Sequence, residues 1–175
     1  MSKFCSLSAS CLSLILFFAI QLPAQSPPAP EKSIFVKKTD GEIRIDGILD
    51  EATWNRGNTL SDFWQYFPLD SAMANARTEV TMLYDDQFLY VGVKSYTTGD
   101  NYITQSLRRD YSYAGNDNVT LVFDTYNDAN TAFAFGMNAF GVRREALISN
   151  GGRQRQDFSS SWDNKWFGEV KTFSN

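Results

Sequence analysis

The chain has 175 residues, with 16 Lys and Arg against 20 Asp and Glu and no His, which gives a net charge of −4. The acidic balance argues against nucleic acid or an anionic membrane surface as the main partner. Without His, the chain cannot build a Ser/His/Asp or Cys/His nucleophile arrangement or an imidazole-based zinc site. Any catalysis would therefore depend on Asp, Glu, Lys or Tyr.

The first 24 residues have the order of a secretory signal peptide. Lys3 precedes an apolar run over residues 12–20, and a small residue, Ala24, follows at the expected cleavage point. The run is shorter than the roughly 18 apolar residues that a membrane helix needs. We therefore expect an exported protein, which would be periplasmic, outer-membrane associated or secreted. Removal of the peptide would also remove both cysteines, Cys5 and Cys11, so that no disulfide could form.

The mature chain is predicted to hold a linker and one domain. Residues 25–33 form a Pro-rich linker, because each proline favours extended backbone. The domain, residues 34–175, is expected to begin with strands at Ile34–Val36 and Glu42–Ile45. A short helix that includes Trp54 follows, with Asp50 as its N-cap.

Two hairpins and a further strand make up the middle of the domain. A period of two in apolar residues predicts strands at Val80–Tyr84 and Phe88–Val93, around an Asp-Asp turn. The same period predicts a longer hairpin within Asn116–Gly141, with a polar turn at Thr125–Asn130. Because both of its strands are apolar or small on both faces, we expect this hairpin at the centre of the sheet rather than at an edge. Another strand is expected at Arg143–Ile148.

These elements predict an all-β fold, an antiparallel β-sandwich with one short helix. The longest irregular connection, residues 101–115, leads into the long hairpin, where functional loops are common. Alternation over residues 166–173 indicates a last strand immediately before the sequence stops at Asn175. We therefore expect a domain that is truncated at its carboxyl end and has an unpaired edge.

Four blocks of sequence resemble the successive blocks of the family 9 carbohydrate-binding modules. They are Ile45–Trp54 (IDGILDEATW), Tyr84–Val91 (YDDQFLYV), Asp117–Asp124 (DNVTLVFD) and Phe135–Gly141 (FGMNAFG). With Arg108-Arg109-Asp110 and Ser161–Trp166 (SWDNKW), the chain is most similar to the amino-terminal domain of exported Bacteroidetes-type proteins in which a predicted outer-membrane barrel follows. The similarity covers Ile34 to Phe173.

The resemblance implies a β-sandwich that binds sugar, often attached to a polysaccharide-degrading enzyme and in some members with bound calcium. Sugar-binding members carry a stacking Trp where this chain has Ala114, with Tyr113 beside it. They also carry an acid where Thr120 stands and an Arg where Gly136 stands.

Four residues are the predicted carbohydrate contacts. Aromatic faces match the C–H face of a sugar ring, and amides bond to its hydroxyl groups. Tyr111 and Tyr113 lie in a polar loop, Asn138 follows an apolar strand, and Trp162 lies in an otherwise polar segment. For the two tyrosines, packing at the rim of the domain is an almost equally good interpretation.

Three acids, Asp46, Asp50 and Glu51, could supply oxygen ligands to calcium, the one cofactor that the sequence suggests. The alternative is purely structural, with Asp50 capping the helix and Asp46 bonding within a turn.

The sequence thus predicts an exported, non-catalytic module that binds a polysaccharide or oligosaccharide and serves carbohydrate breakdown. The alternative is a periplasmic structural or docking domain of an outer-membrane barrel protein, with a degenerate sugar site. A glycosidase needs two carboxylates about 5 to 9 Å apart, and no pair of acids stands out in the sequence. If the chain is part of an enzyme, that enzyme would be a glycoside hydrolase acting on O-glycosyl bonds.

Overall fold

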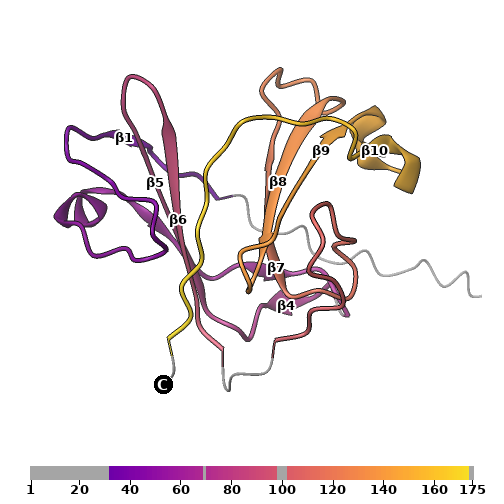
Figure 1. Ribbon diagram of the computed structural model, residues 1–175, viewed down its shortest axis with the longest axis horizontal. Coiled ribbons are helices and arrows are strands. Elements are labelled where there is room, and N and C mark those ends of the chain that lie inside the picture. The colour runs from indigo at the N-terminus through magenta and orange to yellow at the C-terminus, as the bar shows by residue number, and fades with distance from the viewer. Residues whose placement is uncertain (1–31, 69, 98–101, 174–175) are drawn as a thin grey trace, which may run out of the picture.

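The computed structural model describes residues 32–68, 70–97 and 102–173, and the predicted signal peptide and most of the linker lie outside them. The described chain is all-β, as predicted, with two four-stranded sheets and one two-stranded sheet (Figure 1). The sandwich packing itself stays a prediction. Helical structure in the described ranges is limited to 3-10 turns, and none of it is long and apolar enough to cross a membrane.

In chain order the elements are β1 (Lys37–Lys38), η1 (Ala52–Arg56), β2 (Thr59–Leu60), β3 (Trp64–Gln65), β4 (Ala72–Met73), β5 (Thr78–Tyr84), β6 (Leu89–Ser95), β7 (Asn118–Phe123), β8 (Ala132–Asn138), β9 (Arg143–Ile148), η2 (Asn150–Gly152), η3 (Arg155–Asp157) and β10 (Phe158–Ser159).

Sheet 1 is built on the first predicted hairpin, β5 and β6, which pair antiparallel from Thr78↔Ser95 to Tyr84↔Leu89. On its other side β5 pairs with β2 antiparallel and with β1 parallel. The turn η1 covers one face of this sheet, because an added Cβ at Gly92 would lie 3.0 Å from the ring of Trp54. Leu83, on the same face, is completely buried.

Sheet 2 has the order β10-β9-β8-β7, all antiparallel. The predicted long hairpin is β7 and β8, but only β8 is central. In the described chain β7 pairs with β8 alone and forms an edge, so the predicted central position is wrong for this strand. Its outward residue Val122 is exposed, and this apolar side chain on the outer face made both faces of β7 resemble buried ones.

The two faces of sheet 2 are covered differently. On the outer face Ala134, Ala146 and Ile148 form a small buried cluster with Phe158 packed against it. On the inner face the carboxyl-terminal segment, residues 160–173, crosses from β10 toward sheet 1 (Figure 1). This segment contacts both sheets, since Phe167 packs on Phe88 and Gly168 lies against Met137.

Three predicted elements differ from the structure. The strands expected at Ile34–Val36 and Glu42–Ile45 are absent from the described residues, where β1 alone pairs in this region. Backbone near residue 44 is held instead by Glu51, whose Oε1 accepts the N–H of Arg44 at 2.9 Å. The alternating segment 166–173 is extended but joins no ladder within the described structure. Alternation indicated its extended backbone but could not indicate a pairing partner.

Turn carboxylates fix several connections between strands. Asp85 closes the β5–β6 turn by accepting the N–H groups of Gln87 and Phe88, each at 2.7 Å. The N–H of Gln87 is the largest cause that lowers the pKa of Asp85. In the β7–β8 turn the backbone N–H of Thr131 likewise lowers the pKa of Asp128. Both carboxylates are more acidic in the folded chain than in an unfolded one.

This arrangement predicts how stability depends on pH. A carboxylate with a lowered folded pKa stabilises the fold above its unfolded pKa, about 4, and this contribution is lost as pH falls through the folded pKa. No His titrates at intermediate pH. We expect the thermal midpoint to be flat from about pH 7 to 5 and to fall below about pH 4. Calorimetry across this range checks it, and a decline between pH 7 and 5 would contradict it.

Candidate functional site

The structure divides the four predicted sugar contacts between the two faces of sheet 2. Because successive residues of a strand point to opposite faces, Phe135 and Gly136 mark the inner and outer faces of β8. Trp162 packs on the inner face, with its ring centroid 5.7 Å from that of Phe135. Tyr111 and Tyr113 lie on the outer face, beside the register partner of Gly136, Arg144. One ligand surface cannot contain all of them.

Two of the predicted contacts are buried. Tyr111 is 4% exposed, and burial raises the pKa of its hydroxyl group, which has no hydrogen-bond partner in the described part of the chain. Asn138 is 1% exposed, and its Oδ1 accepts the N–H groups of Phe140 and Val142 at 3.0 Å each. In this structure Asn138 holds the β8–β9 turn.

Trp162 is half-buried and contributes to packing. Its ring lies 4.8 Å from Phe133, measured between centroids, and contacts Phe135 edge-on. This aromatic group covers the inner face of β8, where direct stacking on a sugar would compete with the packing.

Tyr113 is the exposed member of the predicted set, with 57% of its surface accessible. It lies beside a row of three residues that runs across sheet 2, Thr120 on β7, Gly136 on β8 and Arg144 on β9. An added Cβ at Gly136 would lie 2.8 Å from both the Arg144 Cγ and the Thr120 Oγ1. Glycine therefore leaves the space through which the Arg144 side chain runs.

The Arg144 guanidinium lies next to two aromatic rings, 5.3 Å from the centroid of Tyr113 and 5.9 Å from that of Tyr111. Within the described structure it forms no salt bridge and donates no hydrogen bond to another side chain or to the backbone. A guanidinium carries five N–H donors. We call Tyr113, Thr120 and Arg144 the Arg144 patch. Sequence reasoning missed Arg144, although a glycine opposite an arginine in predicted neighbouring strands could have indicated it.

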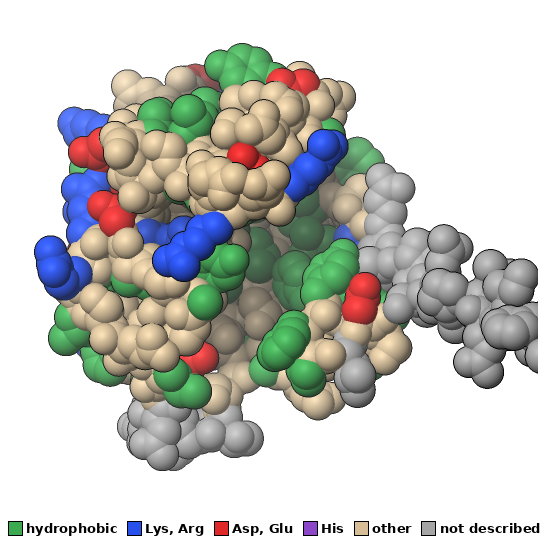
Figure 2. All heavy atoms as spheres, turned by 90° about the vertical axis from the view of Figure 1, so that its right-hand side faces the viewer, with side chains coloured by type: hydrophobic (Ala, Val, Ile, Leu, Met, Phe, Trp, Pro, Cys, Tyr) green, Lys and Arg blue, Asp and Glu red, His purple; other side chains and the backbone are tan. Residues whose placement is uncertain are grey.

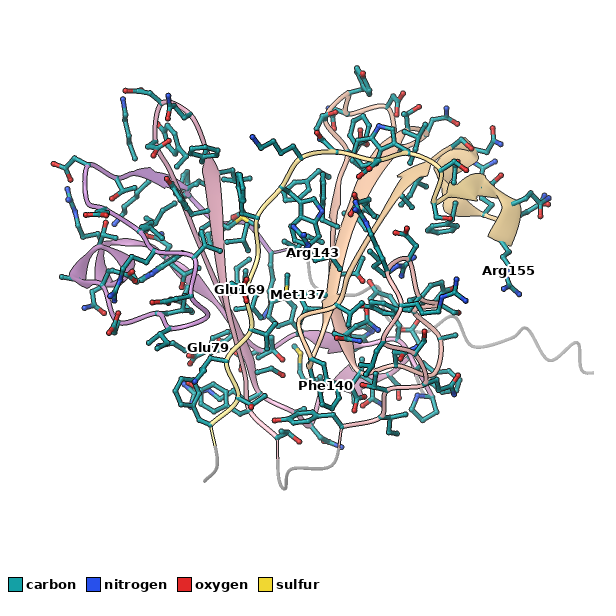
Figure 3. The ribbon with its side chains drawn as sticks, viewed as in Figure 1. Glu79, Met137, Phe140, Arg143, Arg155 and Glu169 are labelled. Atoms are coloured by element: carbon teal, nitrogen blue, oxygen red, sulfur yellow. The ribbon has the colours of Figure 1, made fainter. Side chains whose placement is uncertain are left out.

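The preceding residue, Arg143, points to the inner face. It borders a groove of 570 Å³ that is lined by Arg109, Arg143 and residues 163–167. Its Nη1 donates to the backbone oxygen of Trp166 at 2.8 Å, and its guanidinium lies 5.7 Å from the centre of that ring. We call this surface the Arg143 groove. Figure 3 shows Arg143 and Met137 on the side of sheet 2 that faces the carboxyl-terminal segment.

A buried carboxylate binds two of the residues that line this groove, Arg109 and Trp166. Glu145 is 2% exposed; it forms a salt bridge with Arg109, and its Oε2 accepts the Trp166 indole N–H at 2.8 Å. Arg109 also pairs with Asp163, whose carboxylate is exposed. The Arg109 guanidinium favours the charged form of Asp163. Asp163 is therefore an anionic acceptor at neutral pH, which does not suit it to act as a general acid.

No protein-family model, curated protein or solved structure matches this chain. The ligand chemistry of both surfaces therefore follows from their own side chains.

The predicted calcium ligands surround an arginine. The Arg44 guanidinium lies 3.8 Å from Asp46, 2.9 Å from Asp50 and 3.4 Å from Glu51. Glu51 also accepts the indole N–H of Trp54 at 2.9 Å, and the Asp46 Oδ1 accepts a backbone N–H in a turn. Asp50 does not cap η1, which begins after Glu51 without a side-chain cap. These residues fit a guanidinium rather than a calcium ion, because a cationic side chain already occupies the space between the acids.

We therefore expect calcium to leave the stability of the chain unchanged. The thermal midpoint should be the same with excess calcium and with a chelator, because the Arg44 guanidinium already lies between the acids. In Arg44→Ala the three carboxylates lose this cation, and calcium should then raise the midpoint relative to the chelated sample. A calcium-dependent rise in the unmodified chain would contradict this account.

Proposed function

We propose that the chain is a non-catalytic carbohydrate-binding module of an exported protein, and that it binds a polysaccharide or oligosaccharide at the Arg144 patch. The observation that carries the proposal is a guanidinium with unused donors placed beside an exposed aromatic ring. Export and a role in carbohydrate breakdown remain part of the proposal, supported by the signal-peptide pattern and by the family resemblance.

The chemistry of the patch suits a sugar. The Tyr113 ring offers apolar area for the C–H face of a pyranose, and the Arg144 N–H groups can donate to its hydroxyl oxygens. Thr120 adds an exposed hydroxyl, which donates to Asn118 at 2.8 Å and keeps acceptor capacity. The three side chains lie on the outer face of sheet 2, where a glycan chain could lie across the strands.

The family resemblance also supports glycan binding at the Arg144 patch, because residues of this patch lie next to the family's sugar-contact positions. It expects an aromatic stacking residue at position 114 and an Arg at position 136. Tyr113 precedes Ala114, and Arg144 fills the space above Gly136 from the next strand. The aromatic ring and the guanidinium that the family places at positions 114 and 136 would thus come from the neighbouring residues Tyr113 and Arg144. The buried Tyr111 ring packs against the same guanidinium.

A pull-down on insoluble polysaccharides tests the proposal. Chain lacking the predicted signal peptide should be retained by at least one of cellulose, xylan, chitin or insoluble glucan, and soluble oligosaccharide of the same type should release it. Failure of a folded sample to bind any of them, and any soluble glycan, would contradict the proposal.

The docking alternative also has a specific observation in its favour. Phe140, 61% exposed, packs edge-on against Tyr102 beside the exposed Ile103, so that a hydrophobic patch reaches the surface. Figure 2 shows hydrophobic side chains around a recess on the face that carries β9 and β10. A docking domain would use such patches against a partner, here the predicted outer-membrane barrel. It would bind no glycan, and Phe140→Ser would weaken its association with that barrel without lowering its thermal midpoint.

A further inference from the structure

The Arg143 groove carries a local excess of positive charge on an acidic chain. Arg109, Arg143 and Lys165 supply three cations, against Asp163 at the surface and Glu145 beneath, which leaves one positive charge in excess. The two acids are both engaged with Arg109. In the part of the chain that the structure describes, neither Arg143 nor Lys165 forms a salt bridge.

These two free cations are held in place by aromatic rings. The Arg143 guanidinium lies over Trp166 and uses one N–H to bond the Trp166 backbone oxygen, so that its other donors remain available. The Lys165 Nζ lies 5.6 Å from the centre of the Phe167 ring. A positioned guanidinium with free donors is suited to bind a carboxylate through two parallel hydrogen bonds.

We propose that the Arg143 groove is a second glycan site, specific for sugar units that carry a carboxylate, such as the uronate units of an acidic polysaccharide. The inference rests on the proposed function in that the ligand is a glycan. It adds a site separate from the Arg144 patch, because Arg143 and Arg144 point to opposite faces of sheet 2.

The other groups in the groove favour a sugar acid over a purely anionic ligand. Asp163 is held in its charged form by Arg109, so it can accept hydrogen bonds from sugar hydroxyls, which a ligand with carboxylates alone does not offer. The half-exposed ring of Phe167 offers apolar area to a pyranose. A uronate presents to these groups one carboxylate and several hydroxyls on a single ring.

A matched pair of ligands tests the inference by isothermal titration calorimetry. The chain without its predicted signal peptide is titrated with oligogalacturonate and with the same oligosaccharide after methyl esterification, which removes the charges and adds one methyl group to each carboxyl. We expect the free acid to bind about tenfold more tightly, as the loss of one charge-assisted hydrogen bond requires. High salt should reduce this preference.

Variants locate the site. Arg143→Gln and Lys165→Gln should each reduce the preference for the free acid, whereas Arg155→Gln, which removes an exposed charge at the distant turn η3 (Figure 3), should keep it. Tyr113→Ala should also keep it, since this residue belongs to the other face. If Arg143→Gln lowers the thermal midpoint, Lys165→Gln provides the test, because Lys165 lies in an exposed segment outside the sheets.

Several results would overturn the inference. Equal affinity for the two oligosaccharides, a preference that survives in both groove variants, or equally effective competition by acetate would each do so. If neutral glycans still bind at the Arg144 patch, only this inference fails. If a folded sample binds no glycan of any kind, the proposed function fails with it.

Discussion

Replacing Glu145 by alanine is expected to lower the free energy of unfolding by about 3 kcal/mol, a large share of the stability of a domain of this size. The side chain is buried and accepts the Trp166 indole N–H at 2.8 Å, in addition to its salt bridge with Arg109. Its removal leaves the indole donor without a partner and releases the anchor between β9 and the carboxyl-terminal segment. Urea denaturation of the variant and the parent measures the difference.

Two related variants separate the causes of this loss. Glu145→Gln keeps an acceptor for Trp166 but loses the charge, so it should be intermediate between the parent and Glu145→Ala. Asp163→Asn removes the exposed acid on the same guanidinium and should have a small effect, because exposed ion pairs contribute little. If Asp163→Asn were as destabilising as Glu145→Ala, burial of Glu145 would not be the reason for its importance.

Replacing Tyr113 by alanine is expected to weaken glycan binding at least tenfold, to the limit of detection for a weak module. The variant removes the exposed ring that stacks on the sugar and leaves the buried Tyr111 in place. Arg144→Gln should produce a similar loss, because the donors beside the ring change from a charged guanidinium to a neutral amide. Affinity is measured by fluorescence titration with whichever glycan the parent binds.

Matched controls exist elsewhere on the surface. Tyr126→Ala removes another exposed tyrosine, at the β7–β8 turn, and Arg155→Gln removes another exposed arginine. Both variants should bind glycan as the parent does. These two variants, Tyr113→Ala and Arg144→Gln should all keep the parent's thermal midpoint within the change expected for a surface substitution. Equal losses in Tyr113→Ala and Tyr126→Ala would mean that the Arg144 patch is not the contact surface.

The strands that the sequence predicts well are those that the chain pairs locally. The hairpins β5–β6 and β7–β8 have alternating apolar residues and short polar turns, so sequence pattern and pairing agree. The region near Arg44 has similar alternation, but its backbone N–H bonds to the Glu51 side chain instead of a neighbouring strand. Strand propensity indicates that a segment is extended, but it does not identify which distant segment of the chain pairs with it.

The candidate site was predictable only in part. Tyr113 could be selected because it is an aromatic residue in a polar loop, and the structure leaves it exposed. Asn138 and Trp162 are also chemically suited to contact a sugar. In the structure, however, the Asn138 side chain holds the β8–β9 turn and the Trp162 ring packs on Phe133. Arg144 enters the patch through its register opposite Gly136, a relation between strands that composition and local spacing do not contain.

The most direct test of the proposed function is a titration of residues 25–175 with a panel of soluble polysaccharides and oligosaccharides, with and without calcium, followed by Trp fluorescence and thermal stability. We expect saturable binding of at least one glycan, independent of calcium and lost in Tyr113→Ala. A folded sample that responds to no member of the panel would contradict it and leave the docking domain as the better interpretation.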